Sequence, residues 1–383
     1  MKNLRGLIVT AVICLLTVLL YQTAARFDVL MDMAYPFFSK TIMEVLGGFT
    51  GKLDFCLWQV ALAVYAVAIL VSLALVILFR GNLLRWLGGI LVPVALAGFL
   101  QCGIWGLNYH NKPVAESMKL EVKSATPYEV YQAASYYRNQ ADALAKQVSR
   151  TTDGDVILPA MEKMNKQVTG SYDELVWKYS VFAGPRTPVK ELGWSELFTS
   201  LGVESITIGL TGEAAVNMDQ YGASIPFAMC RETACLMSFA RQEESNFAAY
   251  LACEHSTDTL FRYSGYLNAF LYCSNALYDT NKVYWNRLWE DVSPELRHDV
   301  EAMNLYASAG RQDATEKIDE AYGLYLEKIG EKEGRVADLL VAWYDDQYRP
   351  VEVVPENPFD PTDYDWVFPS ETEPDATEAT EGT

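Results

Sequence analysis

Two short polar segments, CRETAC at residues 230–235 and RQEESNF at 241–247, hold the side chains best suited to chemistry. A carboxylate such as Glu232 can act as a general base, and a thiolate such as Cys235 can bind zinc. Arg231 cannot ligate a metal, because its guanidinium stays protonated and has no lone pair to offer. Taken alone, the two segments describe only helices with charged side chains.

Six further segments, occurring in order along most of the chain, make a family resemblance specific. They are WGLNY (105–109), LTGEAAVN (210–217), IPF (225–227), EESNFAAYLAC (243–253), RYSGYLNA (262–269) and GRVADLLVAWY (334–344). With them, the chain resembles a bacterial membrane family catalogued as domain of unknown function 3810. The resemblance implies three membrane spans followed by an extracytoplasmic domain similar to gluzincin metallopeptidases.

The resemblance gives each position of the RETAC segment an expected role. In zinc peptidases, His-Glu-x-x-His places two imidazoles at i and i+4 on one helix face, with a glutamate between them that activates a metal-bound water. Carried onto this sequence, the histidine positions fall on Arg231 and Cys235 and the catalytic glutamate falls on Glu232. The third metal ligand would be Glu244, or else Glu243. Only the two carboxylate positions match, so the resemblance implies a degenerate motif on a retained scaffold.

Three hypotheses for the function are compatible with this degenerate motif. The leading hypothesis is a membrane-anchored pseudo-metallopeptidase without a zinc cofactor, which binds a peptide, an envelope component or a partner protein. By resemblance, Glu213, Asn217 and Asn246 are candidates for lining its cleft. A second hypothesis is an active zinc metallopeptidase with atypical ligands, in which Glu232 is the general base. A third is a structural or assembly role for the membrane spans and the acidic tail.

Arg231 places a positive charge where the zinc ion would sit. We expect its guanidinium to pair with Glu244 or Glu232, and so to compensate a carboxylate that would otherwise be buried alone. The alternative is that Arg231 simply faces solvent, as charged residues on helices commonly do. The apolar neighbours Phe227 and Leu236 favour the internal pair.

Three long apolar runs, at residues 4–21, 55–79 and 86–108, must hold these segments at a membrane. Each approaches or exceeds the roughly 20 apolar residues that cross a bilayer. Lys2 precedes the first run and Arg5 lies at its start, while Arg80 and Arg85 lie between the second and third runs, so the positive-inside rule places both groups in the cytoplasm. We therefore expect a multi-pass protein of the cell membrane, with a cytoplasmic N-terminus and an extracytoplasmic domain. The first run could instead be a cleaved signal peptide.

After the membrane anchor (1–108), residues 109–350 are predicted to form a mainly α-helical domain with a small β element. Thr126 and Glu129 give a capping box, which predicts a helix from there to about residue 150. The alternating, β-branched segment 204–217 predicts a hairpin or small sheet. A second capping-box signature is present at 171–174, and apolar spacing predicts helices at 226–253, 256–290, 294–309, 311–329 and 333–348.

The charge distribution bears on partners. The net charge is -19, and the tail at residues 351–383 holds ten acidic and no basic residues. No cluster of Lys or Arg is available to neutralise phosphates, so nucleic acid is not an expected partner. The expected partners are the lipid bilayer and a peptide or protein outside the cytoplasm. The tail, which is rich in proline and acidic residues, is expected to be disordered.

Overall fold

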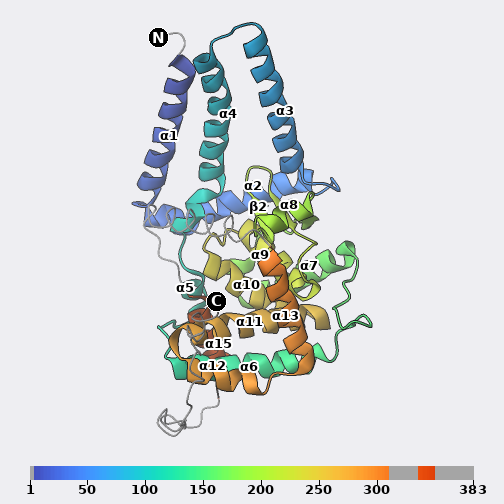
Figure 1. Cartoon of the computed structure of the whole chain (residues 1–383). Helices are drawn as coiled ribbons and strands as arrows, with labels where there is room; N and C mark the ends of the chain where they lie inside the picture. The colour runs from blue at the N-terminus through green and yellow to red at the C-terminus, as the bar shows by residue number, and fades with distance from the viewer. Residues whose placement is uncertain (1–3, 310–334, 350–383) are drawn as a thin grey trace, which may run out of the picture. The chain divides into compact units, whose positions relative to one another are not determined.

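Helices make up most of the chain in the computed structural model, which describes residues 4–309 and 335–349 (Figure 1). One small three-stranded sheet accompanies them. The prediction of a mainly α-helical fold with a small β element is therefore confirmed. The helix predicted at 311–329 and the tail at 351–383 lie outside the described residues, and the boundary at residue 108 stays a prediction.

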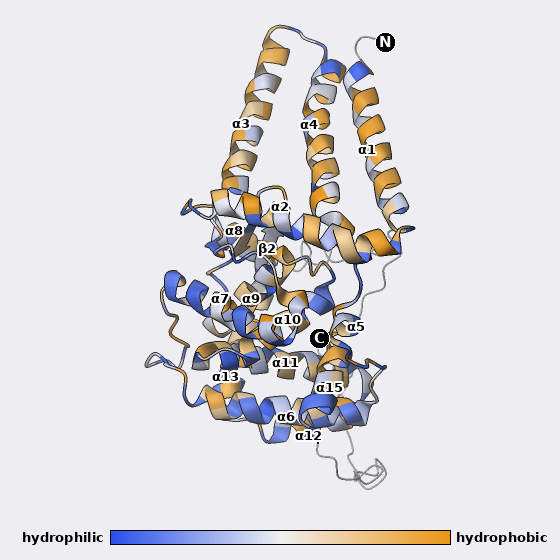
Figure 2. Ribbon diagram, turned by 180° about the vertical axis from the view of Figure 1, so that it is seen from behind, coloured by the Kyte–Doolittle hydropathy of each residue, from blue (hydrophilic) through white to orange (hydrophobic). Residues whose placement is uncertain are grey.

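Three helices near the N-terminus are long and apolar enough to cross a membrane: α1 (Arg5–Ala24), α3 (Leu57–Leu78) and α4 (Leu83–Ile104). They carry hydrophobic residues around their whole circumference, and most of these side chains are exposed (Figure 2). Helices that are apolar on every side suit a lipid environment. They fit a membrane anchor, as the three apolar runs predict.

The third apolar helix differs from its prediction in position. It ends at Ile104 rather than at residue 108, because a 3-10 helix, η3 (Gly106–His110), follows it. It packs against α1, and an added Cβ on Gly6 would lie 2.7 Å from the backbone of Gly88. These two glycines therefore allow the backbones of α1 and α4 to approach closely, as small residues commonly do between membrane helices.

The segment between the first two apolar helices is largely helical, forming the π-helical turn η2 (Leu30–Ala34) and α2 (Tyr35–Thr50). Lys40 of α2 donates hydrogen bonds to the carbonyl oxygens of Val181 and Ala183, each at 2.7 Å. The α2 helix therefore joins the apolar helices to the rest of the chain through specific polar contacts.

The sheet contains β1 (Lys190–Glu191), β2 (Ser205–Ile208) and β3 (Glu213–Val216) in the order β1-β3-β2. β2 and β3 form an antiparallel hairpin within the predicted segment 204–217, while β1 is parallel to β3. Gly212 in the hairpin turn has φ of +61°, which a residue without Cβ adopts readily. Because side chains alternate along a strand, Ser205 and Thr207 lie on one face and Glu213 lies on the other.

Glu213 is fully buried and binds the first turn of α3. Its Oε1 accepts the backbone N–H of Leu57 at 2.8 Å, and its Oε2 accepts that of Trp58 at 3.2 Å. Lys190 lies 2.6 Å from Oε1 and also donates to the carbonyl oxygen of Thr50 at 2.7 Å. The N-terminus of a helix has unsatisfied N–H groups and a partial positive charge, both of which a carboxylate stabilises. The sheet is thereby tied to an apolar helix.

Helix α11 (Thr259–Thr280) packs against α6, α9, α10, α12 and α15. Its buried side chains include Phe261, Leu267 and Phe270. The other helices are α5 (Val114–Met118), α6 (Pro127–Ala145), α7 (Met161–Lys178), α8 (Ser195–Ser200), α9 (Ile225–Leu236), α10 (Gln242–Glu254), α12 (Lys282–Glu290), α13 (Pro294–Ala309) and α15 (Val336–Gln347), with short 3-10 turns η4 (Ser180–Phe182) and η5 (Gly222–Ser224).

Local signals located some helix boundaries correctly and others wrongly. The capping box of Thr126 and Glu129 forms as predicted at the start of α6. The similar signature at 171–174 lies inside α7, which begins ten residues earlier at Met161, so that prediction is wrong. The predicted helix at 226–253 is two helices, because the chain turns between them at Ser238, whose φ is +74°. Likewise, the predicted helix at 256–290 divides into α11 and α12.

Replacing Glu213 with Gln should destabilise the fold strongly, because Lys190 would keep its buried charge without a counter-charge. Removing one partner of a buried ion pair typically costs about 3–5 kcal/mol. The free energy of unfolding of the detergent-solubilised chain measures the effect. Glu191→Gln is the matched control, because Glu191 is on the adjacent strand and is exposed. A loss no greater than that of the control would contradict the assigned role of Glu213.

Candidate functional site

The RETAC segment lies on α9, which packs against the hairpin and against α10. Proline in the first turn favours the start of this helix, since its fixed φ suits the helix and its missing N–H is not needed there. Nearly every residue of α9 is buried, and Glu232 is only 4% exposed. A charged group in such a place requires hydrogen-bond partners.

Three side chains form hydrogen bonds or an ion pair with the Glu232 carboxylate. Ser205 donates to Oε1 at 2.6 Å, and Thr207 donates to Oε2 at 2.7 Å. Arg231 forms an ion pair with Oε1, with its Nε at 3.2 Å. Both oxygens of Glu232 are therefore engaged by hydroxyl groups from β2, and one also faces a guanidinium.

Arg231 turns inward to its neighbour rather than to solvent, since its side chain is 18% exposed. Besides Glu232, its guanidinium donates to the hydroxyl of Ser205. The predicted partners of Arg231 were Glu244 and Glu232, and in the structure Arg231 pairs with Glu232. The hydroxyl of Ser205 thus links the cation and the carboxylate into one closed network.

Glu244 lies in the first turn of α10 and makes different contacts. Its Oε1 accepts the backbone N–H of Val114 at 3.0 Å and lies 3.4 Å from Nη1 of Arg241. Arg241 also donates to the carbonyl oxygen of Tyr109 at 2.7 Å. Burial raises the pKa of Glu244 to about 7, against the opposing effect of the Arg241 charge. The carboxylate of Glu244 is therefore directed to the segment that follows α4.

Cys235 is the last of the positions at which the resemblance would place a metal ligand. Burial raises the pKa of its thiol, and the nearby Glu232 charge raises it further, while Arg231 opposes them. The thiol is therefore protonated at neutral pH, whereas zinc binds the thiolate. Within residues 4–309 and 335–349, no three His, Cys, Asp or Glu side chains converge in a way that could hold a metal ion.

These positions do not fit a zinc ion. Arg231 supplies a fixed positive charge and no lone pair. Glu232 is enclosed by hydroxyl groups, Cys235 keeps its proton, and Glu244 is bound to Arg241 and a backbone amide. An ion placed among them would meet one cation and no preformed set of ligands.

The three residues predicted for a cleft lie in three environments. Glu213 caps α3 from the sheet face opposite to Ser205 and Thr207. Asn217 is fully buried, and its Nδ2 lies 3.0 Å from the hydroxyl of Thr199 and 3.1 Å from that of Tyr306. Asn246 lies on α10 at 1% exposure, and its Oδ1 has no hydrogen-bond partner within the described residues. The contacts of these three residues do not bring them together around one opening.

Sequence reasoning missed Ser205 and Thr207, which complete the network around Glu232. A signal for them was present, because hydroxyl residues at alternate positions of a strand share one face. That signal could not identify α9 as the element that this face covers. The partner of a strand face is decided by packing between distant segments.

A double-mutant cycle tests the pair of Arg231 and Glu232. Arg231→Ala should reduce the free energy of unfolding by about 1–3 kcal/mol, because the buried carboxylate loses its counter-charge. Adding Glu232→Gln removes that charge and should restore part of the loss. Arg262→Ala is the matched control, since Arg262 has no ion pair among the described side chains and should show no coupling to Glu232→Gln. Additive effects of Arg231→Ala and Glu232→Gln would contradict the pair.

Glu244 should make stability depend on pH. The folded protein holds the carboxyl proton up to a pKa of about 7, whereas the ordinary value is 4.5. The stabilisation is therefore present at low pH and is lost as pH rises from about 4.5 to about 7. Glu244→Gln should remove this dependence. Between about pH 5 and pH 8, the free energy of unfolding of the variant should therefore rise relative to that of the parent as pH increases. Glu174→Gln, at an exposed site, is the control. A difference in the free energy of unfolding between Glu244→Gln and the parent that stays constant with pH would contradict the assignment.

The comparisons with known proteins support the family to which the sequence is similar. A family model described as "Protein of unknown function (DUF3810)" matches residues 35–337. This range includes α3, α4, the sheet and the RETAC segment. No curated protein and no solved structure matches the chain. Since the family model matches well over half of the 383 residues, the chain belongs to the DUF3810 family of proteins of unknown function.

Proposed function

We propose that this protein is a membrane-anchored pseudo-metallopeptidase, which binds a peptide, an envelope component or a partner protein outside the cytoplasm without zinc catalysis. The proposal rests on the way in which other side chains enclose the Glu232 carboxylate. A general base must reach a water molecule with a free acceptor position. Ser205, Thr207 and Arg231 surround the Glu232 carboxylate, which is 4% exposed.

The arrangement of helices supports a peptidase-like ancestry for the site. The glutamate of the RETAC segment and Glu244 lie on α9 and α10, which follow each other in the chain and pack together. That is the order in which the family resemblance expects the catalytic glutamate and the third ligand. In this protein the guanidinium of Arg231 supplies the positive charge beside Glu232 that a metal ion would otherwise supply.

The distribution of basic residues supports the proposed orientation. Gly6 of α1 contacts Gly88 of α4, so both helices begin at the same end of the apolar group (Figure 1). Arg5 begins α1, and Arg80 and Arg85 lie around the start of α4. The positive-inside rule assigns this end to the cytoplasm. The sheet, which binds the opposite end of α3 through Glu213, is then outside.

The metal content of the full chain, purified in detergent, tests the proposal. Elemental mass spectrometry should find no stoichiometric zinc, and chelator-sensitive peptide cleavage should be absent. The matched control is the double variant Arg231→His, Cys235→His, which places imidazoles at i and i+4 on α9. Zinc in the variant alone would support the proposal. Stoichiometric zinc in the unaltered chain would overturn it and make Cys235 and Glu244 the ligands to examine.

A further inference from the structure

A pocket of about 390 Å³ lies between α11, α12 and α13, apart from the RETAC segment. Its volume is within the range of small-molecule sites. Aromatic side chains form much of its wall: Tyr278 lies 5.2 Å from Trp285, and Trp285 lies 5.9 Å from Trp289, between ring centroids. Tyr278 is 47% exposed, so the aromatic wall is reachable from solvent.

The polar groups of the pocket have unused hydrogen-bonding capacity. Asn275 and Asn304 line it from α11 and α13, and Glu204 lines it from the chain just before β2. The side chains of these three residues, the hydroxyl of Tyr278 and the indole N–H of Trp285 make no hydrogen bond to other described residues. The site therefore offers both donors and acceptors beside flat apolar rings.

This combination selects among classes of ligand. An anion would meet the Glu204 carboxylate, and no Lys or Arg of the described segments 4–309 and 335–349 lines the pocket. A cation would have to share the Tyr278 ring with the ammonium of Lys282, a residue beside the pocket that already lies 3.4 Å from the centroid of that ring. A neutral ligand with hydroxyl groups can both donate to and accept from carboxamides, and the apolar face of a sugar ring can stack on indole.

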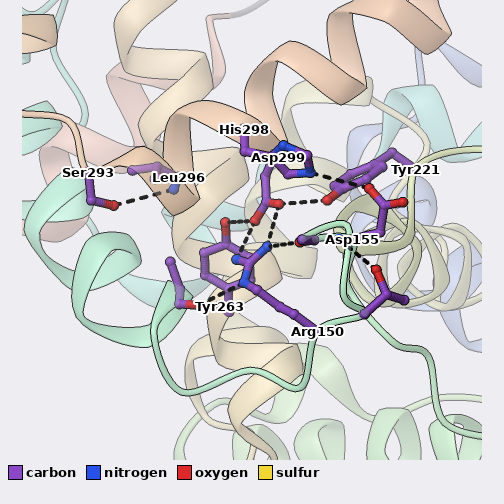
Figure 3. A network of polar contacts seen from close by, with 11 residues as sticks. Arg150, Asp155, Tyr221, Tyr263, Ser293, Leu296, His298 and Asp299 are labelled. Atoms are coloured by element: carbon purple, nitrogen blue, oxygen red, sulfur yellow. Dashed lines mark hydrogen bonds and ion pairs between the residues drawn. The ribbon is translucent and has the colours of Figure 1, made fainter.

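The walls of the pocket are held in place before any ligand binds. Figure 3 shows Asp299 of α13 at the centre of a network of polar contacts. Asp299 is fully buried and directly precedes the pocket residue Val300 in the chain. Arg150 binds both oxygens of Asp299, at 2.7 and 2.8 Å, and Tyr221 donates to Oδ1 at 2.6 Å. Tyr263 of α11 also donates to Asp299, so α11 and α13 are joined at this point. Preorganised walls reduce the entropy lost on binding.

The other walls are fixed in a similar way. The indole N–H of Trp289 on α12 donates to Ser274 of α11 at 2.8 Å. On the far side, the hydroxyl of Tyr306 lies 3.1 Å from Asn217, one of the residues predicted to line a cleft. Asn217 thus supports the pocket by holding one of its aromatic side chains.

We propose that this pocket binds a neutral saccharide of about one to two sugar rings. Trp285 stacks on the apolar face of the ring and Tyr278, which is T-shaped to Trp285, contacts its edge, while Asn275 and Asn304 bind its hydroxyl groups. The inference deepens the proposed function by naming a class of envelope component, and it rests on that proposal for the exposure of the pocket outside the cytoplasm.

The test is a titration of the full chain, followed by tryptophan fluorescence, in a detergent without a sugar headgroup, which would compete for the site. The probes are maltose, cellobiose and N,N′-diacetylchitobiose, with tetramethylammonium and inorganic phosphate as charged comparisons. Saturable binding of at least one disaccharide is expected, with no binding of either ion. Binding of no disaccharide would overturn the proposal, as would binding of tetramethylammonium or phosphate in place of a sugar.

Variants assign the binding to the pocket. Trp285→Ala and Asn304→Ala should each weaken disaccharide binding by about tenfold or more, which corresponds to about 1.4 kcal/mol. Asn304 is exposed, so its variant is expected to fold normally. Trp177→Ala is the matched control, because Trp177 is 90% exposed and lies outside the pocket. Unchanged affinity in both pocket variants would overturn the assignment.

The two proposals fail separately. A chain that contains no zinc and binds no disaccharide removes the saccharide pocket and leaves the pseudo-metallopeptidase proposal standing. A chain that contains stoichiometric zinc but binds a disaccharide through Trp285 removes the pseudo-metallopeptidase proposal and leaves the pocket standing.

Discussion

The ion pair between Glu213 and Lys190 is the interaction on which the arrangement of apolar helices and sheet depends. A carboxylate with no exposure is costly unless its oxygens are paired. Glu213 resolves this by binding two amides of α3 as well as Lys190. Lys190 in turn binds the carbonyl oxygen at the end of α2. One charge pair therefore fixes the start of an apolar helix, the end of α2 and two strands, which a hydrophobic contact could not do with equal directional specificity.

The same hairpin organises the RETAC segment through its other face. Alternation along β2 points Ser205 and Thr207 toward α9 while Glu213 points away from it. The hairpin thus separates an anchoring face from a face that encloses Glu232. A buried glutamate with two hydroxyl donors and a neighbouring guanidinium is stable as a permanent ion pair, and this stability is the physical reason for proposing a domain without metal catalysis.

The saccharide pocket uses another part of the fold, where helices meet around aromatic side chains. Its rigidity comes from Asp299, whose bonds to Arg150 and two tyrosines fix α13 against α11. The RETAC segment and the pocket approach each other at the start of β2, where Glu204 lines the pocket and the next residue, Ser205, binds Glu232. The proposed saccharide binding and the proposed absence of zinc catalysis can therefore coexist in one domain, since they involve different side chains.

The sequence by itself determined two kinds of feature: those that depend on residues a few positions apart, and those that depend only on the surrounding solvent, such as lipid. An apolar run of membrane-spanning length needs only lipid around it, so the three apolar helices were predictable to within a few residues. The capping box at Thr126 and the glycine-containing hairpin turn are also local, because their partners lie within a few positions. The identical signature at 171–174 failed, since α7 had already begun at Met161.

Only the tertiary structure decided which partner each charged side chain has. From the sequence, either Glu232 or Glu244 could be the partner of Arg231. In the structure, Arg231 pairs with Glu232, and Glu244 pairs with Arg241. Glu213, predicted for a cleft, instead caps an apolar helix more than 150 positions away in the chain. The physical reason is that the energy of a buried charge depends on every group brought within a few ångströms of it, and those groups come from segments that are distant in sequence.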